Sequence, residues 1–226
     1  MKPALGLLLA AFFLAAPARA ADLVVVEARG VDLQAGTTLD DSKPLVLKGG
    51  QAVTLVGADG NLFKLRGPYD KPPAPQDGGI DVANALASFG GGSRTEVATV
   101  RMGADVRLPS PWVVDVAHSG NVCLREGQAV VFWRPPDVEG STLTIVPSDR
   151  SWRARVQWPA AAPTLKASDQ FAFRDGDTYL ADFGGESVSI AVNTIPASLA
   201  NSRMQAAWMY EKGCVAQARA LVGTGS

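Results

Sequence analysis

The chain has 226 residues, 19% of them charged, and a formal net charge of −1 at neutral pH. This balance argues against the basic surface that nucleic-acid-binding proteins carry, and no cluster of Lys and Arg indicates attachment to a membrane surface. The length suits one generous domain or two small ones, either of which can bury enough surface to fold without disulfides or metals.

Residues 1–20 have the pattern of a cleavable secretory signal peptide. Lys2 supplies the positive start, residues 4–16 form an unbroken apolar run, and residues 18–20 form an A-x-A cleavage site. The run is shorter than the roughly 20 residues that span a bilayer, so an uncleaved anchor is the weaker alternative. We expect export to the periplasm or the extracellular space, a mature chain that begins at Ala21, and no stable membrane insertion.

Short strands are predicted in residues 21–68. Apolar residues occupy every second position in four places, namely residues 23–25, 45–47, 53–55 and 63–65. This period of two is typical of strands with one buried face. The Asp59-Gly60 step is a strong hairpin signal. Together these features predict a small antiparallel β-domain.

The segment 69–110 is predicted to be a linker that contains one short helix. Its start lies in a Pro/Gly-rich stretch, residues 67–79, which we expect not to continue a strand ladder or a helix. Residues 81–89 are suited to a helix that Asp81 caps and that Gly90-Gly91-Gly92 ends. The sequence leaves open whether this helix packs on a domain.

Residues 111–195 are predicted to form a β-sandwich-like domain. Turn residues separate strand candidates at intervals of about ten residues. The candidates are Trp112–Val116, Asn121–Arg125, Ala129–Arg134, Thr142–Val146, Trp152–Trp158, Gln170–Phe173, Thr178–Phe183 and Ser187–Ile195. In the strand that starts at Trp152, alternate residues form an apolar face that we interpret as core. Asp175-Gly176 is interpreted as a second hairpin turn.

Residues 196–226 are predicted to be helical, because their apolar side chains recur three or four positions apart. Pro196 stands where such a segment can begin, and Gly213 either kinks one helix or joins two. The fold class expected for the whole chain is therefore mainly β, with a small antiparallel β-domain, a β-sandwich-like domain and a C-terminal helical segment.

The two cysteines, Cys123 and Cys214, are predicted to form one disulfide, because exported proteins meet an oxidising compartment. Two buried free thiols are the alternative. The bridge closes a loop of about 90 residues. It also predicts that the C-terminal helix packs on the second β-domain and not on residues 22–66.

The segment around His118 contains the residue types of a catalytic triad, Asp115, His118 and Ser119. Three residues within five positions do not normally converge as nucleophile, base and orienting group, and no G-x-S-x-G motif is present. We interpret His118 as a turn residue. One histidine and two distant cysteines do not match a zinc site, so we expect no metal, no cofactor and no enzymatic activity.

All five tryptophans lie after residue 111. Exported β-proteins can stack sugars on exposed tryptophan rings. Trp112 and Trp133 stand beside prolines or loops, so they are the candidates for ligand stacking.

Several runs in the first β-domain carry a family resemblance. They are Ala35–Asp40, Pro44–Gly50, Val53–Val56, and Asp59-Gly60 continued through Leu65–Pro68. These residues resemble the small β-domain of bacterial FecR-type proteins. The resemblance implies a protein of the bacterial envelope, periplasmic, with a role in binding or signalling.

The hypothesis that these observations favour is a non-catalytic exported protein. It acts as an accessory or sensory component of an envelope system through contact with an envelope protein partner. A ligand- or glycan-binding β-module is the alternative, and a hydrolase is a third reading that the scattered acids and lone histidine disfavour. The oligomeric state is left open.

Overall fold

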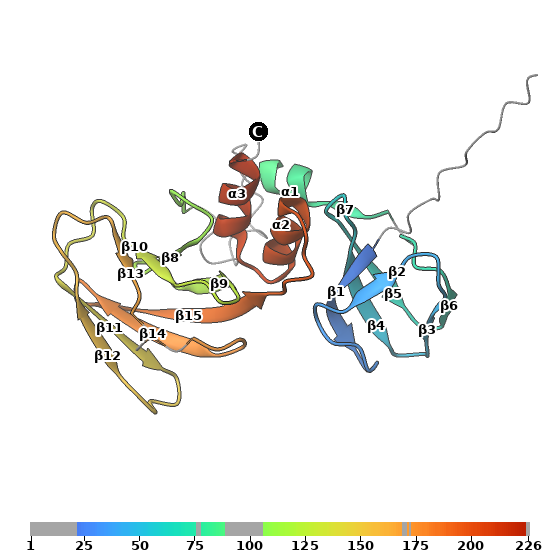
Figure 1. Cartoon of the computed structure of the whole chain (residues 1–226), viewed down its shortest axis with the longest axis horizontal. Coiled ribbons are helices and arrows are strands. Elements are labelled where there is room, and N and C mark those ends of the chain that lie inside the picture. The colour runs from blue at the N-terminus through green and yellow to red at the C-terminus, as the bar shows by residue number, and fades with distance from the viewer. Residues whose placement is uncertain (1–21, 76–77, 89–105, 169–170, 172, 225–226) are drawn as a thin grey trace, which may run out of the picture.

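The computed structural model describes residues 22–75, 78–88, 106–168, 171 and 173–224. Within these residues the protein is mainly β, as expected, with three short helices (Figure 1). The predicted signal peptide, Ala21 and the stretch Gly90-Gly91-Gly92 lie outside the described residues. None of the described helices is long and apolar enough to cross a membrane.

The first β unit is an antiparallel sheet in the order β2-β1-β4-β5-β7, accompanied by the two-stranded sheet β3-β6. Its strands are β1 (Asp22–Arg29), β2 (Thr38–Asp40), β3 (Leu45–Leu47), β4 (Ala52–Val56), β5 (Asn61–Arg66), β6 (Tyr69–Lys71) and β7 (Ile80–Asp81). The predicted turn at Asp59-Gly60 joins β4 to β5, and Val56 lies opposite Leu62. One face of the sheet covers a core that includes Leu23, Leu55 and Leu65.

Two of these strands lie in the segment that we expected to be a linker. Strand β6 pairs with β3, and β7 pairs with β5. The expectation that residues 67–79 interrupt every strand ladder was therefore wrong. Pro68 and Pro72 flank β6 and do not lie within it, so the strand loses no donor to proline. Tyr69 is buried, and its hydroxyl donates to the Pro72 carbonyl at 2.6 Å.

Helix α1 (Val82–Ser88) follows β7 directly. The Asp81 carboxylate accepts a hydrogen bond from the Asn84 backbone N–H at 3.1 Å, which satisfies one of the free donors at the helix start. Val82 and Leu86 are buried in a core shared with the C-terminal helices. The helix is therefore a packed element, which answers the question that the sequence left open.

The second β unit is a sandwich of two sheets (Figure 1). Its strands are β8 (Val113–Asp115), β9 (Gly120–Arg125), β10 (Val131–Trp133), β11 (Thr142–Pro147), β12 (Ala154–Gln157), β13 (Thr164–Lys166), β14 (Thr178–Phe183) and β15 (Glu186–Ile195). The larger sheet runs β12-β11-β14-β15-β9 and the smaller β13-β10-β8. The core between them includes Phe132, Ile145 and Trp158. Ala154 and Trp158 are buried while Arg153 and Arg155 are exposed, which confirms the predicted core face.

The predicted turn at Asp175-Gly176 is present, and the Asp177 N–H donates to the Arg174 carbonyl across it at 3.3 Å. Asp175 also accepts from the Thr194 N–H and Gly176 donates to the Val192 carbonyl, so the turn lies beside β15 just before β14 begins. The hairpin between β14 and β15 itself turns at Gly184-Gly185. Strand β13 was not predicted, and the strand candidate at 170–173 lies partly outside the described residues.

The C-terminal segment forms two helices, α2 (Ser202–Glu211) and α3 (Val215–Gly223). The Asn201 side chain caps α2 by accepting from the Met204 N–H at 2.9 Å. The helix thus starts later than Pro196, where the sequence allowed it to begin. Gly213 has a φ of 79° and separates the helices, and a Cβ there would lie 2.6 Å from the Asn121 amide nitrogen. Both constraints favour glycine.

The two helices share one core with both β units (Figure 1). This central core contains Val24, Val26, Val56 and Leu62 from the first unit, Val82 and Leu86 from α1, Cys123 and Ile195 from the second unit, and ten residues of the C-terminal segment, among them Met204, Trp208, Cys214 and Leu221. The expectation that the helical segment avoids residues 22–66 was therefore wrong. Strand β1 is apolar on both faces, so its second face also needs cover.

The disulfide Cys123–Cys214 is present, with Cα atoms 5.9 Å apart. Cys123 belongs to the central core, whereas its neighbour Val122 belongs to the sandwich core. This alternation is the one expected within a strand. The bridge ties β9 to the start of α3.

Candidate functional site

The predicted turn histidine forms a pair with an aspartate at the edge of the sandwich. His118 Nδ1 lies 2.7 Å from Asp115 Oδ2, and Asp115 Oδ1 accepts from the Ala117 N–H at 2.8 Å. The Asp115 side chain is 12% exposed and that of His118 is 52% exposed. Asp115 thus closes a tight turn after β8, and the same carboxylate also orients His118.

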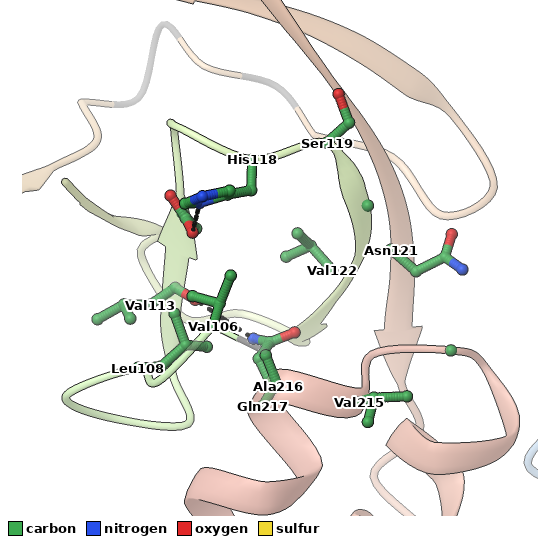
Figure 2. A pocket seen from close by; sticks show the side chains of 13 residues that line it. Val106, Leu108, Val113, His118, Ser119, Asn121, Val122, Val215, Ala216 and Gln217 are labelled. Carbon is green, nitrogen blue, oxygen red and sulfur yellow. Dashed lines mark hydrogen bonds and ion pairs between the residues drawn. The ribbon is translucent and has the colours of Figure 1, made fainter. Parts of the chain in front are cut away.

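Ser119 does not complete a triad with this pair. Its Oγ accepts a hydrogen bond from the Ser189 N–H at 2.9 Å. Figure 2 shows the Ser119 side chain directed away from the His118 ring, toward β15. A nucleophile activated by a histidine must lie within hydrogen-bond reach of it, so the geometry supports the turn interpretation.

The cavity beside this pair is small. It has a volume of about 40 Å³, enough for a water molecule or two but not for an organic substrate. Its walls are largely apolar and come from the segment before β8 and from β8, β9 and α3, including Leu108, Val113, Val122, Val215 and Ala216 (Figure 2).

We expect His118→Ala to change the free energy of unfolding by less than about 0.5 kcal/mol, since exposed pairs contribute little. Asp115→Ala should cost more, because it also removes the acceptor for the Ala117 N–H. Urea denaturation of both variants measures the difference. Loss of a measurable activity in His118→Ala with an unchanged fold would contradict the turn interpretation.

A buried amide, Gln217 on α3, reaches into the edge of the sandwich. It is 3% exposed. Its Oε1 accepts from the Cys123 N–H at 2.7 Å, and its Nε2 donates to the carbonyls of Cys123 at 3.0 Å and Pro111 at 2.9 Å. In the parallel pair of β9 and β15, Cys123 lies opposite Asn193. Gln217 therefore takes the place of a neighbouring strand at the outer edge of β9.

The two tryptophans proposed for stacking are both partly buried. The Arg125 guanidinium carbon lies 3.3 Å from the centroid of the Trp112 ring, and Trp112 also packs against the central core. One face of that ring is therefore already stacked. Trp133 lies on β10 between Asp115 of β8 and Thr164 of β13. The structure does not bring the two rings together in one cleft.

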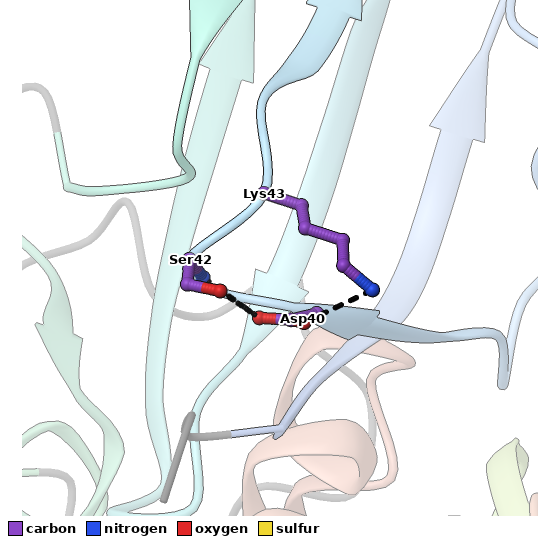
Figure 3. A network of polar contacts seen from close by, with 3 residues as sticks. All are labelled: Asp40, Ser42 and Lys43. Carbon is purple, nitrogen blue, oxygen red and sulfur yellow. Dashed lines mark hydrogen bonds and ion pairs between the residues drawn. The ribbon is translucent and has the colours of Figure 1, made fainter. Parts of the chain in front are cut away.

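A polar network closes the end of β2 (Figure 3). Asp40 accepts from the Ser42 hydroxyl and from the Ser42 N–H at 2.9 Å, and Lys43 Nζ lies 3.2 Å from the same carboxylate. The hydroxyl of Ser42, then its N–H, and then Lys43 lower the pKa of Asp40 below 3.8. This is a local turn motif.

We expect an NMR titration to place the Asp40 pKa below 3.8 and Ser42→Ala to raise it. Since the folded pKa is lowered, the network contributes stability above the unfolded pKa, which is lost as the pH falls through the folded one. Ser151→Ala is the matched control, because Ser151 makes the same contacts to Asp149 and should leave the pKa of Asp40 unchanged. If Ser42→Ala also leaves the pKa of Asp40 unchanged, this account is contradicted.

A surface cleft lies along β4 on the first β unit. Residues opposite one another in an antiparallel sheet share a face. One row across the sheet is Glu27, Thr54 and Lys64, and the next is Arg29, Ala52 and Arg66. The central strand thus carries short side chains between two lines of long charged ones. The resulting β4 trench has a volume of about 350 Å³.

Both ends of the β4 trench are defined. At one end, Gln51 and Gly67 line it. At the other, Lys64 Nζ forms an ion pair with Glu211 Oε1 of α2 at 2.7 Å. Thr54 on the floor is 6% exposed.

The β4 trench carries more positive than negative charge. Its lining includes three cations, Arg29, Lys64 and Arg66, against the single carboxylate of Glu27. Arg29 and Glu27 lie 3.9 Å apart and are largely exposed, so they attract each other only weakly. In the part of the chain that the structure describes, Arg66 has no ion-pair partner.

Sequence reasoning did not identify the β4 trench. Lys64 and Arg66 alternate with Phe63 and Leu65, and this alternation predicts that both lie on the exposed face of a strand. Their partners on β1 depend on the register between strands, and a bulge at Val25–Glu27 shifts that register. The alternation alone cannot show such a shift.

Within the described residues, no three His, Cys, Asp or Glu side chains gather in a way that could hold a metal ion. No family model, no curated protein and no solved structure matches this chain. The functional argument therefore rests on the geometry of the chain itself.

Proposed function

We propose that this protein is a non-catalytic, exported component of a bacterial envelope system and acts through contact with a protein partner. The resemblance of residues 22–68 to FecR-type β-domains and the signal-peptide pattern of residues 1–20 support a periplasmic location. In this proposal the chain has an accessory or sensory role.

The observation that carries the proposal is the way the two β units are joined. One core, drawn from both units and from the C-terminal helices, is pinned by the buried bridge between Cys123 and Cys214. The core packs against both units and the bridge fixes α3 to the second unit, so the two units are presented to a partner in a fixed relation. Two β units held in a fixed relation form a rigid surface, and a rigid surface is typical of proteins that act by binding a partner.

The site geometry gives less support to the two other hypotheses. Ser119 bonds to β15, so it does not serve the Asp115–His118 pair as a nucleophile. One face of the Trp112 ring is covered by Arg125, which leaves less of it for a sugar.

Capture from an envelope extract tests the proposal. The immobilised chain should retain one protein in stoichiometric amounts, and the retained protein should bind the purified chain saturably. The chain unfolded by heat and reductant is the control. Saturable binding on a glycan array, or turnover of a hydrolase substrate, with no protein retained, would overturn the proposal in favour of an alternative.

A further inference from the structure

The β4 trench is suited to an extended occupant. Its two rows are two residues apart along β4, a spacing of about 6.8 Å, which is also the distance between side chains on one face of an extended peptide. The row of Ala52 presents Arg29 and Arg66 on either side, and the row of Thr54 presents Glu27 and Lys64. A peptide lying along β4 therefore meets two guanidinium groups in one row and, two residues further, a lysine that is already paired with Glu211.

The charge of the β4 trench selects the chemistry of that occupant. Guanidinium groups donate in a fork that matches a carboxylate, and two of them stand here, both exposed. The chain as a whole has a net charge of −1, so a local excess of cations is not a general property of its surface. Charge complementarity of this kind favours an anionic partner.

The carboxylates around the β4 trench discriminate between anions. Glu27 stands in one wall and Glu211 at one end. A continuous polyanion such as a nucleic acid carries charge at every step and meets both carboxylates. A peptide with separate acidic side chains places its charges at the cations and neutral residues at the carboxylates.

We propose that the β4 trench binds an extended acidic segment of the protein partner. Arg29 and Arg66 hold one of its carboxylates, and a neutral residue of the segment lies over Thr54, where Glu27 stands opposite the Lys64–Glu211 pair. This inference rests on the proposed function and names the chemistry of the partner.

Fluorescence anisotropy with a labelled peptide tests the inference. The probe is a serine peptide with glutamate at every fourth residue, and its matched control has glutamine in place of glutamate. The purified chain should bind the acidic probe at least about tenfold more tightly than the neutral one, and added salt should weaken binding. The double variant Arg29→Glu/Arg66→Glu should lose at least about tenfold in affinity for the acidic probe.

The matched control variant is Arg153→Glu/Arg155→Glu, which reverses two exposed arginines on or next to β12. It should bind the acidic probe within about twofold of the parent chain. Should the trench variant not show the parent melting temperature, Arg29→Gln/Arg66→Gln replaces it. Equal affinity for the two probes, or an equal loss in both double variants, overturns the inference.

Competition separates the other occupants. If free glutarate displaces the probe at the same concentration of carboxylate groups as the unlabelled peptide, the site takes a small acid and not a partner segment. If an oligonucleotide displaces the probe at a lower concentration of negative charges than the unlabelled peptide needs, the site takes a polyanion. Either result overturns the inference.

Failure here and failure of the proposed function give different results. A partner captured equally by the parent chain and the trench variant retains the proposed function but overturns the inference. Absence of any captured partner, together with turnover or glycan binding, overturns the proposed function itself.

Discussion

Cys214→Ser should lower the free energy of unfolding by about 2–5 kcal/mol. The bridge closes a loop with a sequence separation of 91 residues, and both cysteines are 1% exposed. Its loss frees the start of α3 from β9, so the helices should open before the sheets do. Urea unfolding followed by circular dichroism measures the first effect, and hydrogen exchange measures the second.

Substitution of the other cysteine of the bridge supplies the control. Cys123→Ser should cost about as much as Cys214→Ser, and the double variant should cost little more than either, because one bond is lost in all three. Reduction of the parent chain should reproduce the effect. An unchanged urea midpoint after complete reduction contradicts the stabilising role of the bridge.

Gln217→Leu should lower the free energy of unfolding by about 2–4 kcal/mol, although leucine is the more apolar residue. The change leaves the Cys123 N–H and the carbonyls of Cys123 and Pro111 without the partner that the structure gives them. Buried backbone groups without partners are costly. Denaturant unfolding of the variant, with the bridge intact, measures the loss.

The matched control is Gln128→Leu, because Gln128 is exposed. It should stay within about 0.5 kcal/mol of the parent chain. If Gln217→Leu behaves like this control, water replaces the amide at the edge of β9 without cost, and Gln217 is not what completes that edge.

The strands with one buried face were predictable because their period is local. Lys64 and Arg66 alternate with buried neighbours, and so do Arg153 and Arg155. The short helix at 82–88 was predictable for the same reason, since a cap and an apolar stripe are visible within one turn or two.

The shared core and the β4 trench were not predictable in this way. Strand β1 reads as a buried strand, but nothing within it says that α2 and α3 provide the cover for Val24 and Val26. The β4 trench needs the register of three strands, and Gln217 bonds to a residue 94 positions away. These features arise from pairings between distant segments, which local patterns do not encode.

The central core also governs when the molecule can finish folding. Val24 and Leu221 belong to it together, although the chain is made from the N-terminus and reaches α3 near its completion. Contacts between such distant segments form slowly. Until α2 and α3 arrive, the apolar face of the first sheet remains bare and the Cys123 thiol has no intramolecular partner. The nascent protein therefore passes through a period in which it can aggregate or form a mixed disulfide, and the arrival of the last two helices ends both risks at once.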